Sequence, residues 1–165
     1  MVYTRVVKCG TPALAVLAFL LMSPFLNAQI SESGAPQNAK LDPATLRYQL
    51  PSQIHWVDDA TGAKSAVLLG DPSKPGLYIM LVKWTPHHMS HPHWHANARF
   101  ITVLSGTWWV GTGNKFDPGR TVAMPAGSFV THYGKHVHFD GAKDQEAVLE
   151  IVGEGPATAT PAEVR

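Results

Sequence analysis

Short runs of apolar residues, separated by glycine and proline, recur along the chain from Ser65 onward. They are rich in β-branched and aromatic residues, and none keeps a helical period over the length that a helix needs. Many short strands at roughly regular spacing are typical of a β-sandwich or β-barrel. The pattern therefore predicts an all-β protein, with strands at residues 65–69, 77–84, 100–104, 107–110, 121–124, 128–132, 137–139 and 147–152.

The start of the chain has a different pattern, a positive segment followed by a nearly continuous apolar run. Arg5 and Lys8 supply the charge, residues 11–22 form the run, and Ala28 is a small residue at its end. This order is typical of a cleaved secretory signal, and the run is shorter than the ~20 residues of a spanning helix. We predict a signal peptide over residues 1–28 and a periplasmic or secreted mature protein that is not bound to a membrane.

The rest of the chain is predicted to have three regions. Residues 29–45 are polar and rich in turn formers, which indicates a flexible leader. Within it, Asp42 before Pro43 predicts one short helical turn. The strand pattern predicts a single domain over residues 46–153. Small residues and proline dominate residues 154–165, so this tail is expected to be loosely ordered.

Charge and cysteine content exclude several classes of protein. The 165-residue chain has 13 basic and 12 acidic side chains, and losing residues 1–28 removes two basic ones, which leaves 11 − 12 = −1. A near-neutral chain without a Lys/Arg cluster lacks the electrostatic footprint of a nucleic-acid-binding protein. The single cysteine, Cys9, lies in the predicted signal, so disulfides do not stabilise the domain. Motifs for a serine nucleophile or a phosphate-binding loop are absent from the sequence.

Histidine is concentrated in one part of the chain, since eight of the nine lie between residues 87 and 138. Because alternate residues of a strand point to one face, His93 and His95 can present two imidazoles to one point. A second group, His132, His136 and His138, follows about forty residues later with the same even spacing. Two facing strands would therefore close a site with three or four nitrogen ligands for a metal ion.

The remaining histidines and the large aromatic residues are interpreted as structural. An isolated or loop histidine is more often a surface residue than a ligand, which applies to His55, His87 and His88. Aromatic side chains are more often part of a core than platforms for a ligand. This interpretation covers Trp94, Trp108, Trp109 and Phe129.

The two histidine groups resemble the two sequence motifs of the cupin superfamily. The first motif has the outline G-x5-H-x-H-x3-4-E-x6-G, and His93 to Gly106 keep its spacing, with Arg99 in place of the glutamate and no leading glycine. The second has the outline G-x5-P-x-G-x2-H-x3-N, and Gly127 to His138 keep its spacing without its proline, second glycine and asparagine. Twenty residues separate the motifs. The phrases HWHANARFITVLSGTWWVGTG and MPAGSFVTH also resemble small bacterial cupins.

The resemblance implies a single-domain, jelly-roll β-barrel whose interior binds a divalent metal through His93, His95 and His138. Arg99 alters the usual ligand set, because a guanidinium stays protonated and cannot coordinate a cation. Three arrangements follow from the residues. The metal is held by three histidines, His132 or another histidine of the second group adds a fourth ligand, or the pocket is metal-free and its arginine binds a carboxylate.

Imidazole ligands without a carboxylate indicate a divalent transition metal (Zn, Cu, Fe, Ni or Mn) and not Mg or Ca, which prefer oxygen. We expect an oxygenase-type oxidoreductase, such as a dioxygenase, that acts on a small organic acid or phenolic compound. Arg99 would be its catalytic residue, which orients the substrate anion by bidentate hydrogen bonds. The alternatives are a non-catalytic cupin that binds a metal or a small anionic ligand, and a bare scaffold. The resemblance also implies a homodimer.

Overall fold

The computed structural model describes residues 41–164. The predicted signal peptide and the leader up to residue 40 lie outside the described residues. The chain divides into two compact units, described over residues 41–47 and 48–164. In the first unit, Asp42 begins the single turn predicted from the sequence, and its carboxylate accepts a hydrogen bond from the Ala44 amide (2.9 Å). None of the helices in the described part is long and apolar enough to cross a membrane.

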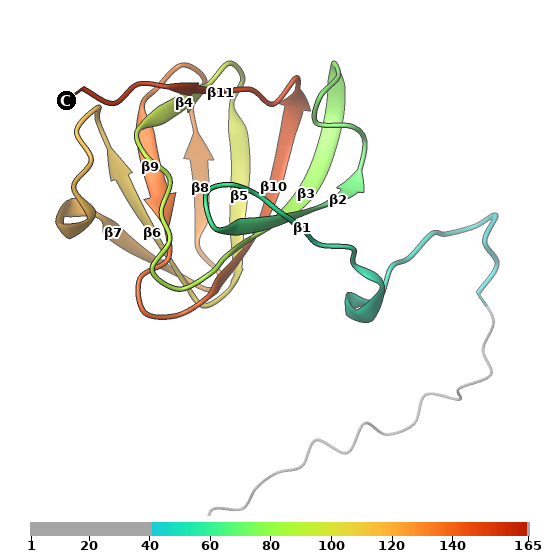
Figure 1. The fold of residues 1–165 in the computed structure, drawn as a ribbon. Helices are drawn as coiled ribbons and strands as arrows, with labels where there is room; N and C mark the ends of the chain where they lie inside the picture. Colours follow the sequence, from blue (N-terminus) through green and yellow to red (C-terminus); the bar gives the residue numbers. More distant parts are fainter. Residues whose placement is uncertain (1–40, 165) are drawn as a thin grey trace, which may run out of the picture. The chain divides into compact units, whose positions relative to one another are not determined.

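Six antiparallel strands form the first sheet of the second unit, in the order β1-β2-β3-β10-β5-β8 (Figure 1). The buried side chains of its central strands are apolar and include Trp84, Leu149 and Ile101, which suits a half-buried pleated surface. The strands are β1 (Val57–Asp58), β2 (Ala63–Leu69), β3 (Gly76–Trp84), β5 (Arg99–Ser105), β8 (Phe129–His132) and β10 (Ala147–Gly155).

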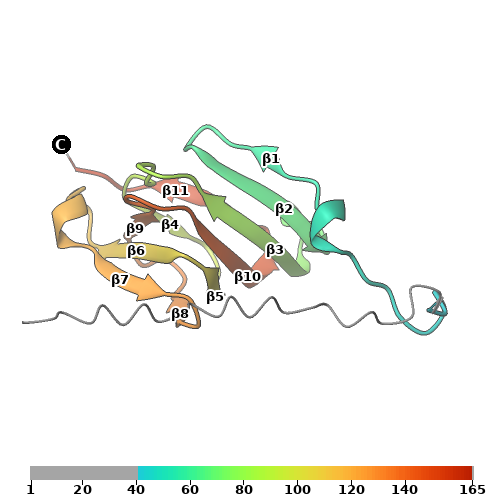
Figure 2. The ribbon, with the colours of Figure 1, turned by 90° about the horizontal axis from the view of Figure 1, so that it is seen from below.

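Five antiparallel strands form the second sheet, in the order β11-β4-β9-β6-β7. From β4 onward the chain crosses repeatedly between the two sheets, which is the connectivity of the predicted jelly roll. Figure 2 shows β2, β3 and β10 on one side and β4, β9 and β6 on the other. The strands are β4 (His93–His95), β6 (Thr107–Thr112), β7 (Val122–Pro125), β9 (His138–Gly141) and β11 (Ala159–Pro161). Two short 3-10 turns are η1 (Pro51–Gln53) and η2 (Pro118–Arg120).

The core lies between the inner faces of the sheets. Its largest fully buried side chains include Trp108, Tyr78, Phe139 and Ile101. Such side chains exclude water from the barrel interior and so lower the effective dielectric around any polar group placed there. The all-β fold predicted from the sequence is confirmed, and each of its eight predicted strands overlaps an observed one.

Two predictions about individual segments are wrong. The tail 154–165 is not loose, because β10 continues to Gly155 and β11 pairs with β4. Small residues and proline are compatible with a short edge strand, which the composition alone did not indicate. Phe129 is not a core residue, since it begins the edge strand β8 and is 65% exposed.

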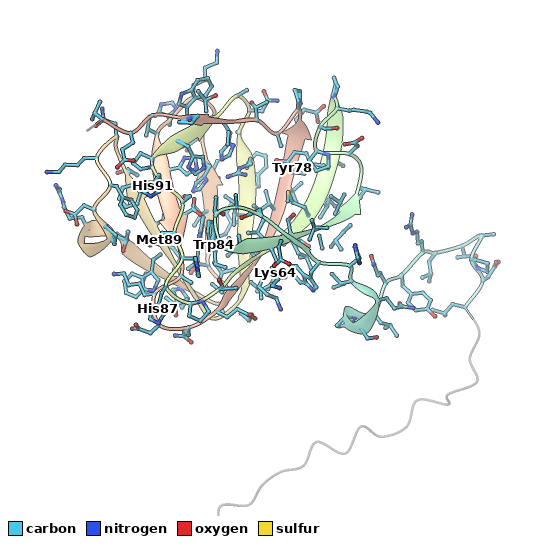
Figure 3. The ribbon with its side chains drawn as sticks, in the orientation of Figure 1. Lys64, Tyr78, Trp84, His87, Met89 and His91 are labelled. Atoms are coloured by element: carbon cyan, nitrogen blue, oxygen red, sulfur yellow. The ribbon has the colours of Figure 1, made fainter. Side chains whose placement is uncertain are left out.

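A cross-strand row on the inner face of the first sheet determines where its polar side chains lie. Tyr78 (labelled in Figure 3) is opposite Gly153, Gly153 is opposite Arg99, and Arg99 is opposite His132. A Cβ atom on Gly153 would lie 2.5 Å from the tyrosine hydroxyl oxygen and 2.7 Å from Cζ. The glycine therefore lets the aromatic ring lie across β10.

We expect Gly153→Ala to lower the free energy of unfolding by about 1–3 kcal/mol, because the added methyl overpacks this row. Urea unfolding followed by far-UV circular dichroism measures the change. Gly119→Ala is the matched control, since its added Cβ would meet only the Asp117 side chain, at 3.1 Å. Equal stability of the two variants would contradict the proposed packing of Tyr78 on Gly153.

Candidate metal centre

Strands β4 and β9 bring three of the predicted metal ligands together. The two strands pair with His93 opposite His138, and His95 follows on the same face of β4. The ligand nitrogens of the three histidines all lie within 4.8 Å of one another. His95 and His138 are buried and His93 is half-buried. We call this group the histidine triad.

Each imidazole of the triad is oriented by a hydrogen bond from its Nδ1 atom to a backbone carbonyl. A carbonyl oxygen only accepts, so Nδ1 carries the proton and Nε2 of the neutral ring carries a lone pair. A hydrogen bond from the ring nitrogen that does not face the metal fixes the tautomer and the ring orientation of metal-binding histidines. The carbonyls belong to His91 for His93 (2.8 Å), Thr158 for His95 (2.8 Å) and His136 for His138 (3.1 Å).

The lone pairs of the triad converge on one point. Nε2 of His93 and Nε2 of His95 are 3.1 Å apart, and neither carries a proton when both Nδ1 atoms donate. Two lone pairs at this distance repel each other unless a cation or a shared proton lies between them. Two ligands at ~2.1 Å from one ion and 3.1 Å apart subtend roughly 95° at that ion, which fits a transition metal. Nε2 of His138, also buried, has no partner among the described residues.

Burial keeps His95 and His138 in the form that binds metals. Desolvation, together with the nearby Arg99 guanidinium, lowers the pKa of His95 to about 3. Desolvation likewise lowers the pKa of His138 to about 4, against an opposing contribution from Asp140. Both rings are neutral at pH 7, and metal binding needs neutral imidazole.

His132 lies beside the triad but does not complete it. Its ring centroid is 3.8 Å from that of His138, and its ligand atom belongs to a second cluster with His138 and Asp140. The side chain is 7% exposed, desolvation lowers its pKa to about 2, and neither ring nitrogen has a partner among residues 41–164. His136, the other candidate for a fourth ligand, is exposed and belongs to neither cluster.

The sequence interpretation missed a buried carboxylate, Asp140 on β9. It is 5% exposed, and its Oδ1 accepts a hydrogen bond from the Trp108 indole (3.2 Å). Ser90 holds its backbone, because the Asp140 amide donates to Ser90 Oγ (3.0 Å) and the Ser90 amide donates to the Asp140 carbonyl (2.8 Å). Oδ2 lies 3.8 Å from His138 Nε2. An acidic residue two positions after the motif histidine was the available signal.

Arg99 faces the interior from the start of β5. Its Nε atom is buried without a partner, and no carboxylate oxygen of residues 41–164 lies within 4.0 Å of its guanidinium. Burial lowers the pKa of Arg99, while Asp140 and Tyr78 oppose that shift. The burial that raises the pKa of Tyr78 is likewise opposed by the arginine charge. A guanidinium in this state is a strong site for an anion.

His93 and His95 of the triad and Arg99 border one cavity, of about 440 Å³. This volume is in the range of small-molecule sites, which are mostly apolar with a few polar groups that fix orientation. Its polar lining includes His93, His95, Arg99 and Asp140. Its apolar lining includes Met80, Val82, Trp84, Ile101, Leu149 and Ile151.

The histidines of the segment between β3 and β4 lie outside the triad. His87 and His91 lie on the segment between β3 and β4, and their side chains are 74% and 65% exposed (Figure 3). Nδ1 of His91 is 2.8 Å from the Glu163 carboxylate, and its ring stacks on Phe116. His88 contacts Thr85 through Nδ1 (2.9 Å).

No protein-family model matches the chain, and no curated protein matches its sequence. Solved structures match its fold. The polyketide cyclase RemF from Streptomyces resistomycificus aligns with a TM-score of 0.61 at 15% identity, over 73% of this chain and 87% of its own. A cupin-2 domain protein of Rhodospirillum rubrum aligns with a TM-score of 0.52 at 15% identity, over 68% and 76%. An RmlC-like cupin from Shewanella frigidimarina aligns with a TM-score of 0.53 at 14% identity, over 67% and 92%.

This chain has the cupin fold. At these identities the matches show the fold alone, and what each neighbour acts on is a property of that neighbour. It has histidines at all three histidine positions of the two cupin motifs, and the structure brings them together. It departs at the glutamate position, where Arg99 lines the cavity. The role of the triad as metal ligands stays a prediction.

Proposed function

We propose that this cupin is a metal-dependent enzyme of the oxygenase type that acts on a small organic acid or phenolic compound. One observation carries the proposal: three unprotonated Nε2 atoms converge beside a largely apolar cavity that is also lined by Arg99, whose buried Nε has no partner among the described residues. The donor set suits a divalent transition metal, with Zn, Cu, Fe, Ni and Mn as candidates. A bound metal would supply Lewis-acid activation of a substrate oxygen or, if redox-active, reaction with O2.

The residues of the chain define the substrate class in three ways. Arg99 would bind a carboxylate or phenolate through charge-assisted hydrogen bonds, close enough to the triad to lower the pKa of His95. The apolar wall, including Met80 and Ile151, would hold the body of the substrate and exclude water. The cavity volume of about 440 Å³ restricts the substrate to a small molecule.

The experiment that tests this function begins with the metal. Protein purified without a histidine tag is analysed for bound metals, and the apoprotein is titrated with Zn²⁺, Cu²⁺ and Fe²⁺. We expect one transition metal per chain. Small aromatic and aliphatic acids are then screened for metal-dependent oxygen consumption. Saturable binding of an acid without turnover would favour the non-catalytic alternative, and a chain that takes up no metal would refute the proposal.

A substitution at Arg99 tests the recognition of the anion. We expect Arg99→Gln to weaken the binding of an acid found in the screen by roughly 10- to 100-fold, because a charge-assisted hydrogen bond is lost. Binding of the corresponding neutral amide should change little. Arg120→Gln, at an exposed arginine on η2, is the control and should bind the acid like the wild type. Equal losses for acid and amide would contradict recognition of charge.

Export and pairing remain part of the proposal. The charged, apolar and small-residue order of residues 1–28 supports a secretory signal and a periplasmic or secreted protein. Exposed apolar residues on the outer face of the first sheet, such as Phe100, Leu104 and Phe129, support a homodimer. Mass spectrometry of the mature N-terminus and light scattering in solution measure the two properties.

A further inference from the structure

Tyr78 has a buried hydroxyl group that packing alone does not explain. The side chain is 0% exposed, and its hydroxyl oxygen has no hydrogen-bond partner among residues 41–164. A buried polar atom without a partner costs free energy, so its place in a fold needs an explanation. A phenylalanine would fill the same space without this cost. The hydroxyl group is therefore expected to have a role besides packing.

The hydroxyl group lies beside Arg99 because a glycine separates the two residues. Tyr78 (labelled in Figure 3) is opposite Gly153 on β10, and Gly153 is opposite Arg99 on β5. A Cβ atom on Gly153 would lie 2.5 Å from the hydroxyl oxygen, so this oxygen lies over the glycine itself. Neighbouring strands are ~4.8 Å apart, which places the Arg99 backbone one strand away from the oxygen. The side chain of an arginine can cover that distance.

Arg99 has a buried donor without a partner. Its Nε atom makes no hydrogen bond with the described residues. Burial lowers the pKa of Arg99, and Tyr78 is one of the groups that oppose this shift. Burial raises the pKa of Tyr78, and the arginine charge opposes that shift in turn. The two side chains are therefore close enough to interact, and each has a polar atom that the other can satisfy.

We propose that Tyr78 is a positioning residue for Arg99: its hydroxyl oxygen accepts a hydrogen bond from the guanidinium and holds this group where it binds the carboxylate of the substrate. The inference rests on the proposed function, in which Arg99 binds an anion in the cavity. Arg99 is one of the residues that line this cavity and Tyr78 is not. The tyrosine would therefore act through the arginine and not on the substrate itself.

A phenol suits this role better than a carboxylate would. A carboxylate beside the guanidinium would neutralise its charge and compete with the anion of the substrate. The phenol is uncharged at pH 7, because burial raises the pKa of Tyr78, and its oxygen still accepts a hydrogen bond. The guanidinium is thus oriented while its charge stays available to the substrate.

Tyr78→Phe tests the inference, because it removes the hydroxyl group and keeps the aromatic ring. The probes are benzoate and butyrate, with their neutral amides benzamide and butyramide, and calorimetry measures their binding. We expect the variant to bind both acids about 3- to 10-fold more weakly than the wild type and both amides equally well, since one neutral hydrogen bond is lost. Tyr133→Phe, at a tyrosine that is 67% exposed, is the matched control and should bind all four probes like the wild type.

A double variant shows whether the tyrosine acts through the arginine. In the Arg99→Gln background, Tyr78→Phe should cause no further loss of acid affinity, because the group that the tyrosine holds is gone. Additive losses would mean that the tyrosine acts on the acid independently of Arg99, and would overturn the inference.

NMR of the protein without any acid gives a readout of the hydrogen bond itself. The Nε–H group of Arg99 should give a ¹⁵N–¹H signal that exchanges slowly with water, and the signal is assigned by its absence in Arg99→Gln. In Tyr78→Phe this signal should shift and exchange faster, because its acceptor is lost.

Wild-type acid affinity in Tyr78→Phe, or an unchanged Arg99 signal, would overturn the inference and leave the proposed function standing. Equal losses for acids and amides would assign Tyr78 to packing and overturn the inference as well. Failure of the wild type to bind either acid would instead overturn the proposed recognition of an anion, on which the inference rests.

Discussion

The variant His93→Ala/His95→Ala is expected to lose stoichiometric binding of a transition metal while it keeps the β fold. Two of the three converging nitrogens disappear, and even the loss of an outer-shell partner costs 10- to 100-fold in affinity. We therefore expect metal affinity to fall by well over ~100-fold. Elemental analysis and titration of apoprotein with Zn²⁺ measure the change.

Thermal unfolding gives an independent measure of the loss of metal binding. A metal at about 1,000 times its Kd stabilises the folded state by ~4 kcal/mol, so the melting temperature of the wild type rises when metal is added. The double variant should show no such rise. His87→Ala/His91→Ala removes two histidines of the same stretch that lie outside the triad, and it should respond to metal like the wild type. An unchanged metal content in His93→Ala/His95→Ala would exclude the site.

Acid is expected to destabilise the metal-free protein steeply below about pH 6.5. Burial lowers the pKa of three histidines in the folded state, to about 3 for His95, about 2 for His132 and about 4 for His138. In the unfolded chain each titrates near 6.5, so the unfolded state binds more protons as the pH falls. Stability is therefore fully present above pH 6.5 and is lost on acidification.

The dependence of the free energy of unfolding on pH has an expected slope. Each buried histidine contributes on the order of 1 kcal/mol per pH unit between pH 6 and pH 4, so three together give a loss of several kcal/mol. Urea unfolding of the apoprotein at a series of pH values measures it. His132→Gln removes one titrating group and should make the dependence shallower by about one third, whereas His87→Gln should leave it unchanged. A flat profile from pH 7 to pH 5 would mean that these rings are protonated in the fold.

Periodicity along the chain was enough to predict the sheets and half of the candidate site. Alternation of apolar residues indicated the long strands, and a spacing of two placed His93 and His95 on one face. The same rule could not identify Asp140, because all four residues of β9 are buried and the strand has no polar face. A charge inside such a segment was the only signal.

Features that depend on the register between paired strands could not be predicted from the sequence. Three pairs of strands align so that one row on the inner face contains Tyr78, Gly153, Arg99 and His132. A slip of one residue in the register of a strand would turn its side chain in this row to the other face. The Thr158 carbonyl that orients His95 is a backbone group, so the pattern of side chains along the sequence does not predict it.

Because His95 is oriented by the Thr158 carbonyl, the histidine site cannot be completed before the end of the chain has folded. Every strand that carries a triad histidine precedes β11 in the chain, yet His95 gains its fixed tautomer only when Thr158 and β11 have docked beside β4. During synthesis the N-terminal parts of a chain emerge first, so the earlier histidines are exposed while the last strand is still missing. A metal ion held by the triad would therefore reach its final coordination late in folding, and the incomplete chain would offer it only a flexible and weaker site.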